Sequence, residues 1–93
     1  MKKILLIVNP VSGKRKAVKY LADIISVFNQ ADASVQVYIT KESRDATNAV
    51  KTCASDMDLV VCCGGDGTLS ETITGVLEAG LTLPVVYSNR FYQ

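Results

Sequence analysis

Residues 58–71 read DLVVCCGGDGTLSE, and this stretch decides the fold class. Its apolar run over residues 59–63 is continuous, which is typical of a strand that is covered on both faces of a parallel sheet. A glycine-rich loop follows the run, and apolar residues then repeat at helical spacing at Leu69, Ile73, Val76 and Leu77. The stretch therefore predicts a buried strand, a glycine loop and a helix.

Both ends of that helix carry recognisable signals. Thr68 and Glu71 have the spacing of a capping box, in which each side chain bonds the backbone of the other residue. Gly80 stands where a helix commonly ends in a left-handed residue. We therefore expect a capped helix that stops before Gly80.

The rest of the chain repeats the alternation of strand and helix. The further elements that we expect are strands at 3–8, 34–40 and 84–87 and helices at 14–28 and 44–54. The order β-α-β-α-β-α-β predicts a three-layer α/β fold with a parallel sheet and right-handed crossovers. The 93 residues form one domain in this interpretation.

The apolar patterns also predict the strand order. Strands 3–8 and 58–63 lack polar alternation, as expected of central strands that are covered on both faces, whereas strand 34–40 alternates and is expected at an edge. The resulting order, 2-1-3-4, has a topological switch point between the first and third strands, where such sheets bind ligands. Two unusual loops, 9–14 and 64–68, follow those two strands.

Composition bounds the function. The chain is 48% hydrophobic and 20% charged with a net charge of +1, which fits a globular protein and argues against charge-driven nucleic-acid binding. The apolar run 4–8 is too short for a membrane span or a signal peptide, so we expect a cytoplasmic protein. The three cysteines, Cys53, Cys62 and Cys63, lack metal-site spacing and are expected to be small apolar residues.

The loop Gly64-Gly65-Asp66-Gly67-Thr68 carries the first functional signal. Glycines let the backbone approach a ligand closely, and the following helix directs N–H groups and its positive dipole end to the same place, so phosphate is the expected guest. A carboxylate such as Asp66 would repel a polyphosphate unless a divalent cation lay between them. The loop therefore predicts a Mg²⁺-nucleotide site, with a plain strand-to-helix turn as the alternative.

The loop after the first strand carries the second signal. Asn9 and Ser12 offer side-chain hydrogen bonds, and Gly13 permits close approach. Lys14 lies at the start of a predicted helix, where a cation is unfavourable unless an anion is nearby. Residues 1–20 hold six basic groups and no acidic one, a bias that would also attract an anionic membrane surface or lipid head group.

Together, Asn9-Pro-Val-Ser-Gly13 and Gly64-Gly-Asp-Gly-Thr68-Leu-Ser-Glu71 resemble the catalytic domain of diacylglycerol kinases and bacterial lipid kinases, over about residues 2–87. The resemblance implies that ATP lies between the two loops and that its γ-phosphate passes to a diacylglycerol-like lipid hydroxyl with Mg²⁺ present. It implies nucleotide contacts from Asn9, Ser12, Gly13, Thr40, Gly64, Gly65, Asp66, Gly67, Thr68 and Glu71.

The sequence departs from this family at two places. Ser70 stands where the family usually has Asn, and residues 87–93 read YSNRFYQ where the family continues into Pro-x-Gly-Thr-x-Asn-Asp and a second, β-rich domain with the catalytic base. We therefore expect the first part of a lipid kinase, truncated or shifted in frame near Tyr87, that binds nucleotide weakly and turns over little or nothing.

Two other interpretations stay open at this point. NAD-kinase-like and phosphofructokinase-like proteins also place a Gly-Gly-Asp-Gly loop here, although the Asn9-Pro-x-Ser-Gly13 loop favours lipid kinases. The second interpretation is a non-catalytic, truncated module with a vestigial phosphate loop. Its fourth strand would be an unprotected edge that pairs with a second copy to form a homodimer.

Overall fold

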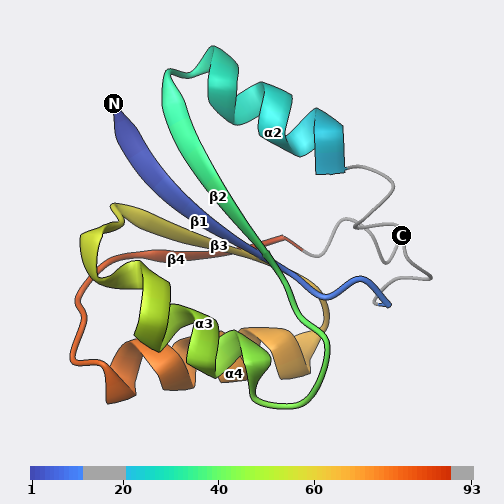
Figure 1. Cartoon of the computed structure of the whole chain (residues 1–93), viewed down its shortest axis with the longest axis vertical. Coiled ribbons are helices and arrows are strands. Elements are labelled where there is room, and N and C mark those ends of the chain that lie inside the picture. Colours follow the sequence, from blue (N-terminus) through green and yellow to red (C-terminus); the bar gives the residue numbers. More distant parts are fainter. Residues whose placement is uncertain (12–20, 89–93) are drawn as a thin grey trace.

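A computed structural model describes residues 1–11 and 21–88 of the chain. Figure 1 labels its elements, which are β1 (Lys2–Val8), α2 (Leu21–Gln30), β2 (Ala33–Ile39), α3 (Asp45–Cys53), the 3₁₀ turn η2 (Ala54–Asp56), β3 (Leu59–Cys63), α4 (Asp66–Glu78) and β4 (Val85–Ser88). The predicted alternation of strands and helices is confirmed for these residues. The predicted helix 14–28 lies partly outside them, and its described part continues to Gln30.

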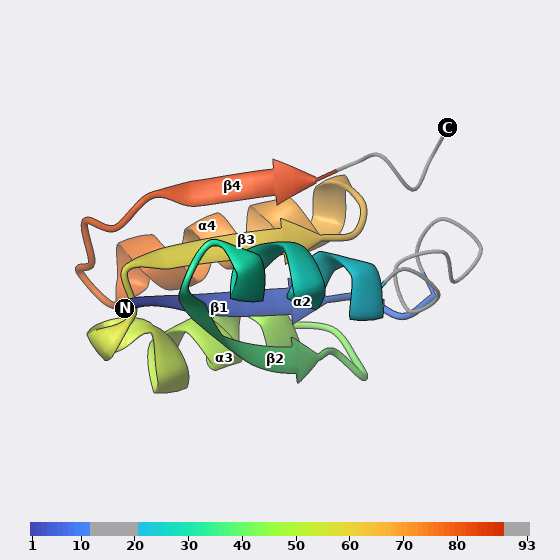
Figure 2. The ribbon, with the colours of Figure 1, turned by 90° about the horizontal axis from the view of Figure 1, so that it is seen from above.

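The sheet has four parallel strands in the order β2-β1-β3-β4, as predicted (Figure 2). β1 pairs with β2 from Lys2–Ala33 to Val8–Ile39, and on its other side it pairs with β3 as far as Val8–Cys63. β2 and β4 are the two edge strands. The pairing of β4 with a second copy stays a prediction.

Helices cover both faces of the sheet, which is why β1 is apolar at successive positions (Figure 1). Leu6 and Val8 point to the face that packs against α2, and Leu5 and Ile7 point to the face that packs against α3 and α4. All four side chains are fully buried. Because side chains alternate along a strand, β1 contributes residues to two separate hydrophobic cores, one on each face of the sheet.

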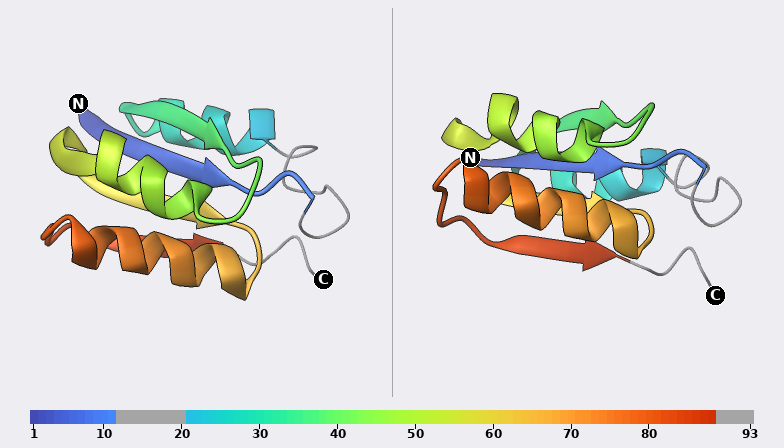
Figure 3. Two further views of the ribbon diagram at one scale, coloured as in Figure 1. Left: turned by 60° about the horizontal axis from the view of Figure 1, so that its bottom comes forward. Right: turned by 90° about the horizontal axis from the view of Figure 1, so that it is seen from below.

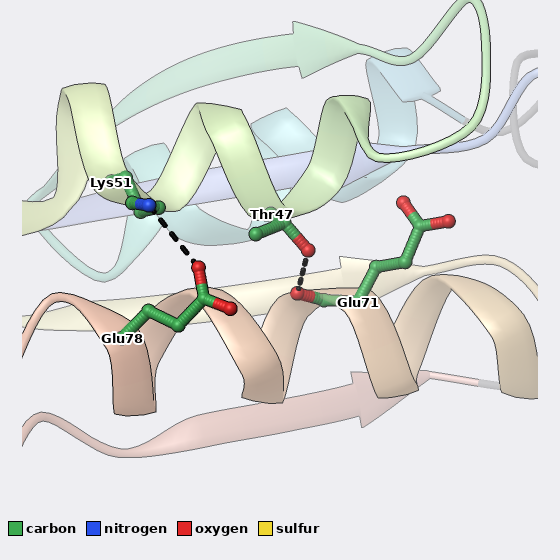
Figure 4. A network of polar contacts seen from close by, with 4 residues as sticks. All are labelled: Thr47, Lys51, Glu71 and Glu78. Carbon is green, nitrogen blue, oxygen red and sulfur yellow. Dashed lines mark hydrogen bonds and ion pairs between the residues drawn. The ribbon is translucent and has the colours of Figure 1, made fainter.

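Helices α3 and α4 run side by side beneath the sheet (Figure 3). A Cβ atom on Gly75 would lie 2.8 Å from the carbonyl oxygen of Thr47, so only glycine allows this approach. The Thr47 hydroxyl donates to the Glu71 carbonyl at 2.6 Å, and Lys51 pairs with Glu78 at 3.1 Å (Figure 4). The hydroxyl bond is partly buried and the ion pair is exposed, so the ion pair contributes little to stability.

The start of α4 corrects the predicted capping box. The helix begins at Asp66 with Gly65 as its N-cap, three residues before the expected N-cap Thr68, and no side chain makes a cap bond. Thr68 is instead the third helical residue, and its hydroxyl accepts a hydrogen bond from the Asn9 side chain at 3.4 Å. The contact with the neighbouring loop replaces the reciprocal bond with Glu71.

The buried face of α4 also differs from the apolar repeat seen in the sequence. The residues that it buries are Thr68, Thr72, Gly75 and Val76. Ile73 and Leu77 are 42% and 73% exposed, because the close approach of α3 requires small side chains on the inner face. At the other end, Gly80 has a φ of 68°, and the two hydrogen bonds Gly80–Leu77 and Leu81–Val76 form a Schellman motif, as a left-handed residue there predicts.

Cys62 and Cys63 are buried in β3, as predicted, and no cysteine of the chain forms a disulfide. Burial raises the pKa of Cys62, and burial together with the neighbouring Cys62 raises the pKa of Cys63 to about 11. Both thiols therefore stay neutral and serve as packing groups. Within residues 1–11 and 21–88, no helix has the length and apolar character that crossing a membrane requires.

Candidate functional site

The candidate site begins where β1 and β3 end side by side. The Asn9 N–H donates to the Cys63 carbonyl at 2.9 Å, so the pairing of the two strands continues into both loops. The Asn9 amide also donates to the Thr68 hydroxyl at 3.4 Å, and its oxygen accepts the Val11 N–H at 3.2 Å. The two loops singled out in the sequence thus contact each other at one edge of the sheet.

Gly64 makes this contact possible. A Cβ atom at Gly64 would lie 2.6 Å from the Thr68 hydroxyl oxygen and 3.2 Å from the Asn9 Cβ. The first distance is shorter than real Cβ contacts and the second is tighter than most of them, so a side chain here would require Thr68 and Asn9 to shift. Gly64 is therefore needed for packing and not for an unusual backbone angle, since Gly80 is the glycine with positive φ in the described chain.

The first turn of α4 presents backbone N–H groups at the same edge. The first helical bond runs from the Leu69 N–H to the Gly65 carbonyl at 3.1 Å. The N–H groups of Asp66, Gly67 and Thr68 therefore have no partner within the helix and form the positive end of its dipole. At Gly67, an added Cβ would meet no heavy atom of the described chain within 4 Å outside its own helix.

Thr40 lies at the end of β2 and is anchored to β1. Its N–H and its hydroxyl both donate to the Val8 carbonyl, at 2.8 and 3.3 Å. The residue is buried, and its hydroxyl oxygen keeps lone pairs that can accept a hydrogen bond. The exit of β2 is thereby fixed beside the exit of β1.

A pocket of about 520 Å³ lies between the ends of β1 and β2 and the starts of α3 and α4. Five of the predicted site residues line it, namely Asn9, Thr40, Gly67, Thr68 and Glu71. Figure 4 shows the Glu71 side chain rising from α4 toward the N-terminal end of α3. Three further predicted residues, Ser12, Gly13 and Lys14, fall outside the described residues.

Gly64, Gly65 and Asp66 lie at the same sheet edge but do not line this pocket. The Asp66 side chain is in the first turn of α4, near β4, where the Tyr87 hydroxyl lies 3.5 Å from its Oδ1 atom. The same hydroxyl lies 3.2 Å from the Gly64 carbonyl oxygen. The glycine loop therefore has two sides, one toward the pocket and one toward β4.

The loop between β2 and α3 forms a wall that the sequence reasoning missed. It contributes Lys41, Glu42 and Ser43, and the strand and helix beside it contribute Ile39 and Ala46. The predicted strand order could have indicated that this loop lines the site. In the order 2-1-3-4, the carboxyl end of the second strand must lie beside that of the first, so the polar stretch after Thr40 belongs to the same edge.

A magnesium ion fits this site only together with a phosphate. In the part of the chain that the structure describes, no three acidic, cysteine or histidine residues gather closely enough to hold a metal by themselves. Asp66 supplies one exposed carboxylate beside the N–H groups of α4. Protein-bound Mg²⁺ commonly takes one or two carboxylates, substrate phosphates and water, so the single carboxylate is compatible with a nucleotide-bridged ion.

Comparisons with known proteins agree with this geometry. Residues 3–87 match the family model described as "Diacylglycerol kinase catalytic domain". A diacylglycerol kinase from Bacillus subtilis (strain 168) is 38% identical over 89 residues, which are 92% of this chain and 29% of that protein. A diacylglycerol kinase from Staphylococcus haemolyticus (strain JCSC1435) is 35% identical over 74 residues, which are 78% of this chain and 22% of that protein.

The fold is similar to solved structures as well. The crystal structure of a diacylglycerol kinase from Bacillus anthracis str. Sterne has a TM-score of 0.76 and 30% identity, and the match covers 92% of this chain and 32% of that one. The chain thus spans less than a third of the length of these relatives. Because the family model covers most of the sequence, the chain belongs to the diacylglycerol kinase catalytic domain family.

Proposed function

We propose that this chain supplies the ATP-binding part of a lipid kinase, which transfers the γ-phosphoryl group of ATP to the hydroxyl of a diacylglycerol-like lipid. The family membership supports the reaction class, and two loops that meet at one sheet edge support the nucleotide site. In this proposal the nucleotide occupies the edge formed by the pocket and the first turn of α4.

The two sides of the glycine loop suit different parts of ATP. The pocket has apolar walls from Pro10, Ile39 and Ala46. Its two carboxylates, from Glu42 and Glu71, outnumber its one ammonium group, from Lys41, so it favours a neutral base with N–H groups over a polyphosphate. The N–H groups at the start of α4 favour the phosphates. We therefore place the adenine in the pocket and the phosphates toward Asp66.

Each residue then has a definite part in holding the nucleotide. The Thr68 and Thr40 hydroxyls and the Glu71 carboxylate line the side where the base would lie. Asp66 would hold Mg²⁺ through the phosphates, and the ion would neutralise charge on the transferring group. The lysine and arginine groups of the first twenty residues add an attraction for anionic phosphate or lipid head groups.

The transfer step needs groups that the described residues do not supply. A bond forms between the lipid hydroxyl oxygen and the γ-phosphorus, the bond from that phosphorus to the β–γ bridging oxygen breaks, and ADP leaves with its electron pair. The hydroxyl proton must pass to a base. No residue of the described chain is assigned to that task, so we propose that the chain alone binds nucleotide weakly and has little or no turnover.

One observation carries the nucleotide site above the others, and it is the space at Gly67. Among the described residues, this glycine has neither a positive φ nor a steric neighbour that would exclude a side chain, and it lines the pocket. The described part of the fold gives no reason for glycine at this position. A ligand that lies against the backbone there gives one.

Calorimetric titration of the chain with ATP, with Mg²⁺ and with EDTA, tests this proposal. The wild type should bind MgATP and lose affinity by about tenfold when Mg²⁺ is removed, whereas Asp66→Ala should bind weakly in both conditions. Asp23→Ala is the matched control, because Asp23 is also an exposed acidic residue of a helix, but α2 covers the opposite face of the sheet. Unchanged affinity in Asp66→Ala would remove Asp66 from the site, and a wild type that binds no MgATP would overturn the proposed function.

The acceptor is tested separately with radiolabelled ATP and two candidate acceptors, diacylglycerol in mixed micelles and NAD. We expect little or no labelled product from the chain alone with either acceptor. Phosphorylation of the lipid at the rate of a complete family member would overturn the proposed low turnover. Labelled NADP would instead assign the chain an NAD-kinase-like activity.

A further inference from the structure

The loop between β2 and α3 is held in shape by one carboxylate. The Oδ2 atom of Asp45 accepts the backbone N–H of Lys41 at 2.7 Å and that of Glu42 at 3.1 Å. The Asp45 N–H donates in return to the Glu42 carbonyl at 3.2 Å. Three hydrogen bonds thus close a ring of five residues around a single side chain.

This closure forces a strained backbone next to it. Arg44 has φ 71° and ψ 0°, a left-handed conformation that a residue with a Cβ atom seldom adopts. An exposed arginine gains nothing locally from this conformation. The strain persists because the Asp45 bonds fix the loop on both sides of it.

The closed loop also shapes the pocket. Lys41, Glu42 and Ser43 line the pocket, whereas Asp45 itself does not. Asp45 is half-buried at the first residue of α3, behind the wall that faces the cavity. Its carboxylate is therefore placed to set the position of the wall without touching a ligand.

We propose that Asp45 is a positioning residue that fixes the β2–α3 loop against the nucleobase, so that the chain distinguishes ATP from a bare polyphosphate. This inference rests on the proposed function, which places the base in the pocket. The Asp45 carboxylate bonds the backbone of the β2–α3 loop and not the N–H groups in the first turn of α4, where the phosphates are placed, so its effect should fall on recognition of the base.

Calorimetry with two probes, MgATP and magnesium tripolyphosphate, separates the two contributions in the full chain. The wild type should bind MgATP more tightly than tripolyphosphate. Asp45→Ala should raise the MgATP dissociation constant by about five- to tenfold and change that of tripolyphosphate by less than about twofold. A merely structural role would weaken both probes alike, in step with the loss of folded protein measured by thermal unfolding.

Two further variants separate the hydrogen bonds from the charge. Asp45→Asn keeps an acceptor oxygen at the same distance from the backbone and should retain most of the MgATP affinity. Asp45→Glu keeps the charge at the start of α3 but moves the oxygens, so it should behave like Asp45→Ala even if the alanine variant does not fold. Asp23→Ala should match the wild type with both probes.

Three results would overturn the inference. One is an equal loss for both probes in Asp45→Ala or Asp45→Glu, and another is a full loss of MgATP affinity in Asp45→Asn. The third is a wild type that binds the two probes equally, because the base would then make no contact with the pocket while the phosphate site stood. A wild type that binds neither probe would overturn the proposed function itself.

Discussion

Helix α4 contains two glycines that have opposite meanings. Around Gly75, the helix packs so closely on α3 that an added Cβ would lie 2.8 Å from both the Thr47 carbonyl oxygen and the Val50 Cβ. Around Gly67, eight residues earlier, the same Cβ would meet no described residue outside the helix within 4 Å. The first glycine is required by the fold, and the second is compatible with a side chain in the fold as it stands.

The comparison shows that a glycine-rich motif is not uniform in its purpose. Gly64 resembles Gly75, because the Thr68 hydroxyl and Asn9 crowd it. Gly67 differs from both and faces the pocket. Packing therefore explains part of the motif, and a ligand is needed to explain the rest. Replacing each helical glycine by alanine is the direct way to test this difference.

Gly75→Ala should give the largest change in stability. Overpacking costs about 1–3 kcal/mol, and the contact with the Thr47 backbone and the Val50 Cβ places this site in the upper part of that range. The better helix propensity of alanine returns at most about 1 kcal/mol, so the free energy of unfolding should fall by about 1–2 kcal/mol. Urea denaturation followed by circular dichroism measures it. A variant as stable as the wild type would show that α3 and α4 separate at little cost, and the structural meaning of Gly75 would be lost.

Gly67→Ala is the matched change at the open end of the helix. Its free energy of unfolding should stay within about 1 kcal/mol of the wild type or rise, because alanine fits the backbone and meets no neighbour. Its MgATP affinity should fall by about tenfold, since the new methyl group occupies the space where the ligand approaches the backbone. Calorimetry and urea denaturation on one preparation measure both. Equal MgATP affinity in this variant and the wild type would contradict a ligand at Gly67.

The fold could be predicted from the sequence because its signals are local and repeated. The uninterrupted apolar residues of β1 and β3 indicated central strands, and the alternation in β2 indicated an edge, so the strand order followed. The first turn and inner face of α4 could not be predicted in the same way. The Thr68 hydroxyl accepts a hydrogen bond from Asn9, which is 59 residues away in the sequence. The burial of Thr72 beside Gly75 depends on the approach of α3.

The candidate site was predictable only on its glycine side. The motif at 64–68 and the loop after β1 are recognisable in the sequence, whereas Lys41, Glu42 and Ser43 resemble an ordinary polar turn. Their place in the pocket wall depends on the Asp45 bonds, which a sequence does not display. The Tyr87 hydroxyl likewise reaches the glycine loop only because β4 pairs with β3 in register Cys62–Tyr87, which the sequence does not display.

Tyr87→Phe tests the side of the glycine loop that faces β4, opposite the side with Gly67. We expect this variant to have the smallest effect. The phenol donates one hydrogen, which the Gly64 carbonyl at 3.2 Å or the Asp66 carboxylate at 3.5 Å can accept. Removing the hydroxyl leaves the ring in place, so stability should change by less than about 1 kcal/mol. If the phenol orients the loop for Mg²⁺, the MgATP dissociation constant should rise by about two- to fivefold, while affinity for ATP in EDTA should not change.

Tyr38→Phe is the control for that small effect. Tyr38 is a half-buried residue of β2 that packs against the core beside α3 and α4, on the strand farthest from β4 in the sheet. Its variant should bind MgATP as the wild type does, with and without EDTA. If both tyrosine variants lose the same affinity, the loss reflects general loosening of the sheet. If Tyr87→Phe alone loses affinity, and only when Mg²⁺ is present, the hydroxyl acts through Asp66. The side of the glycine loop that faces β4 would then bind the metal, whereas the side with Gly67 contacts the nucleotide.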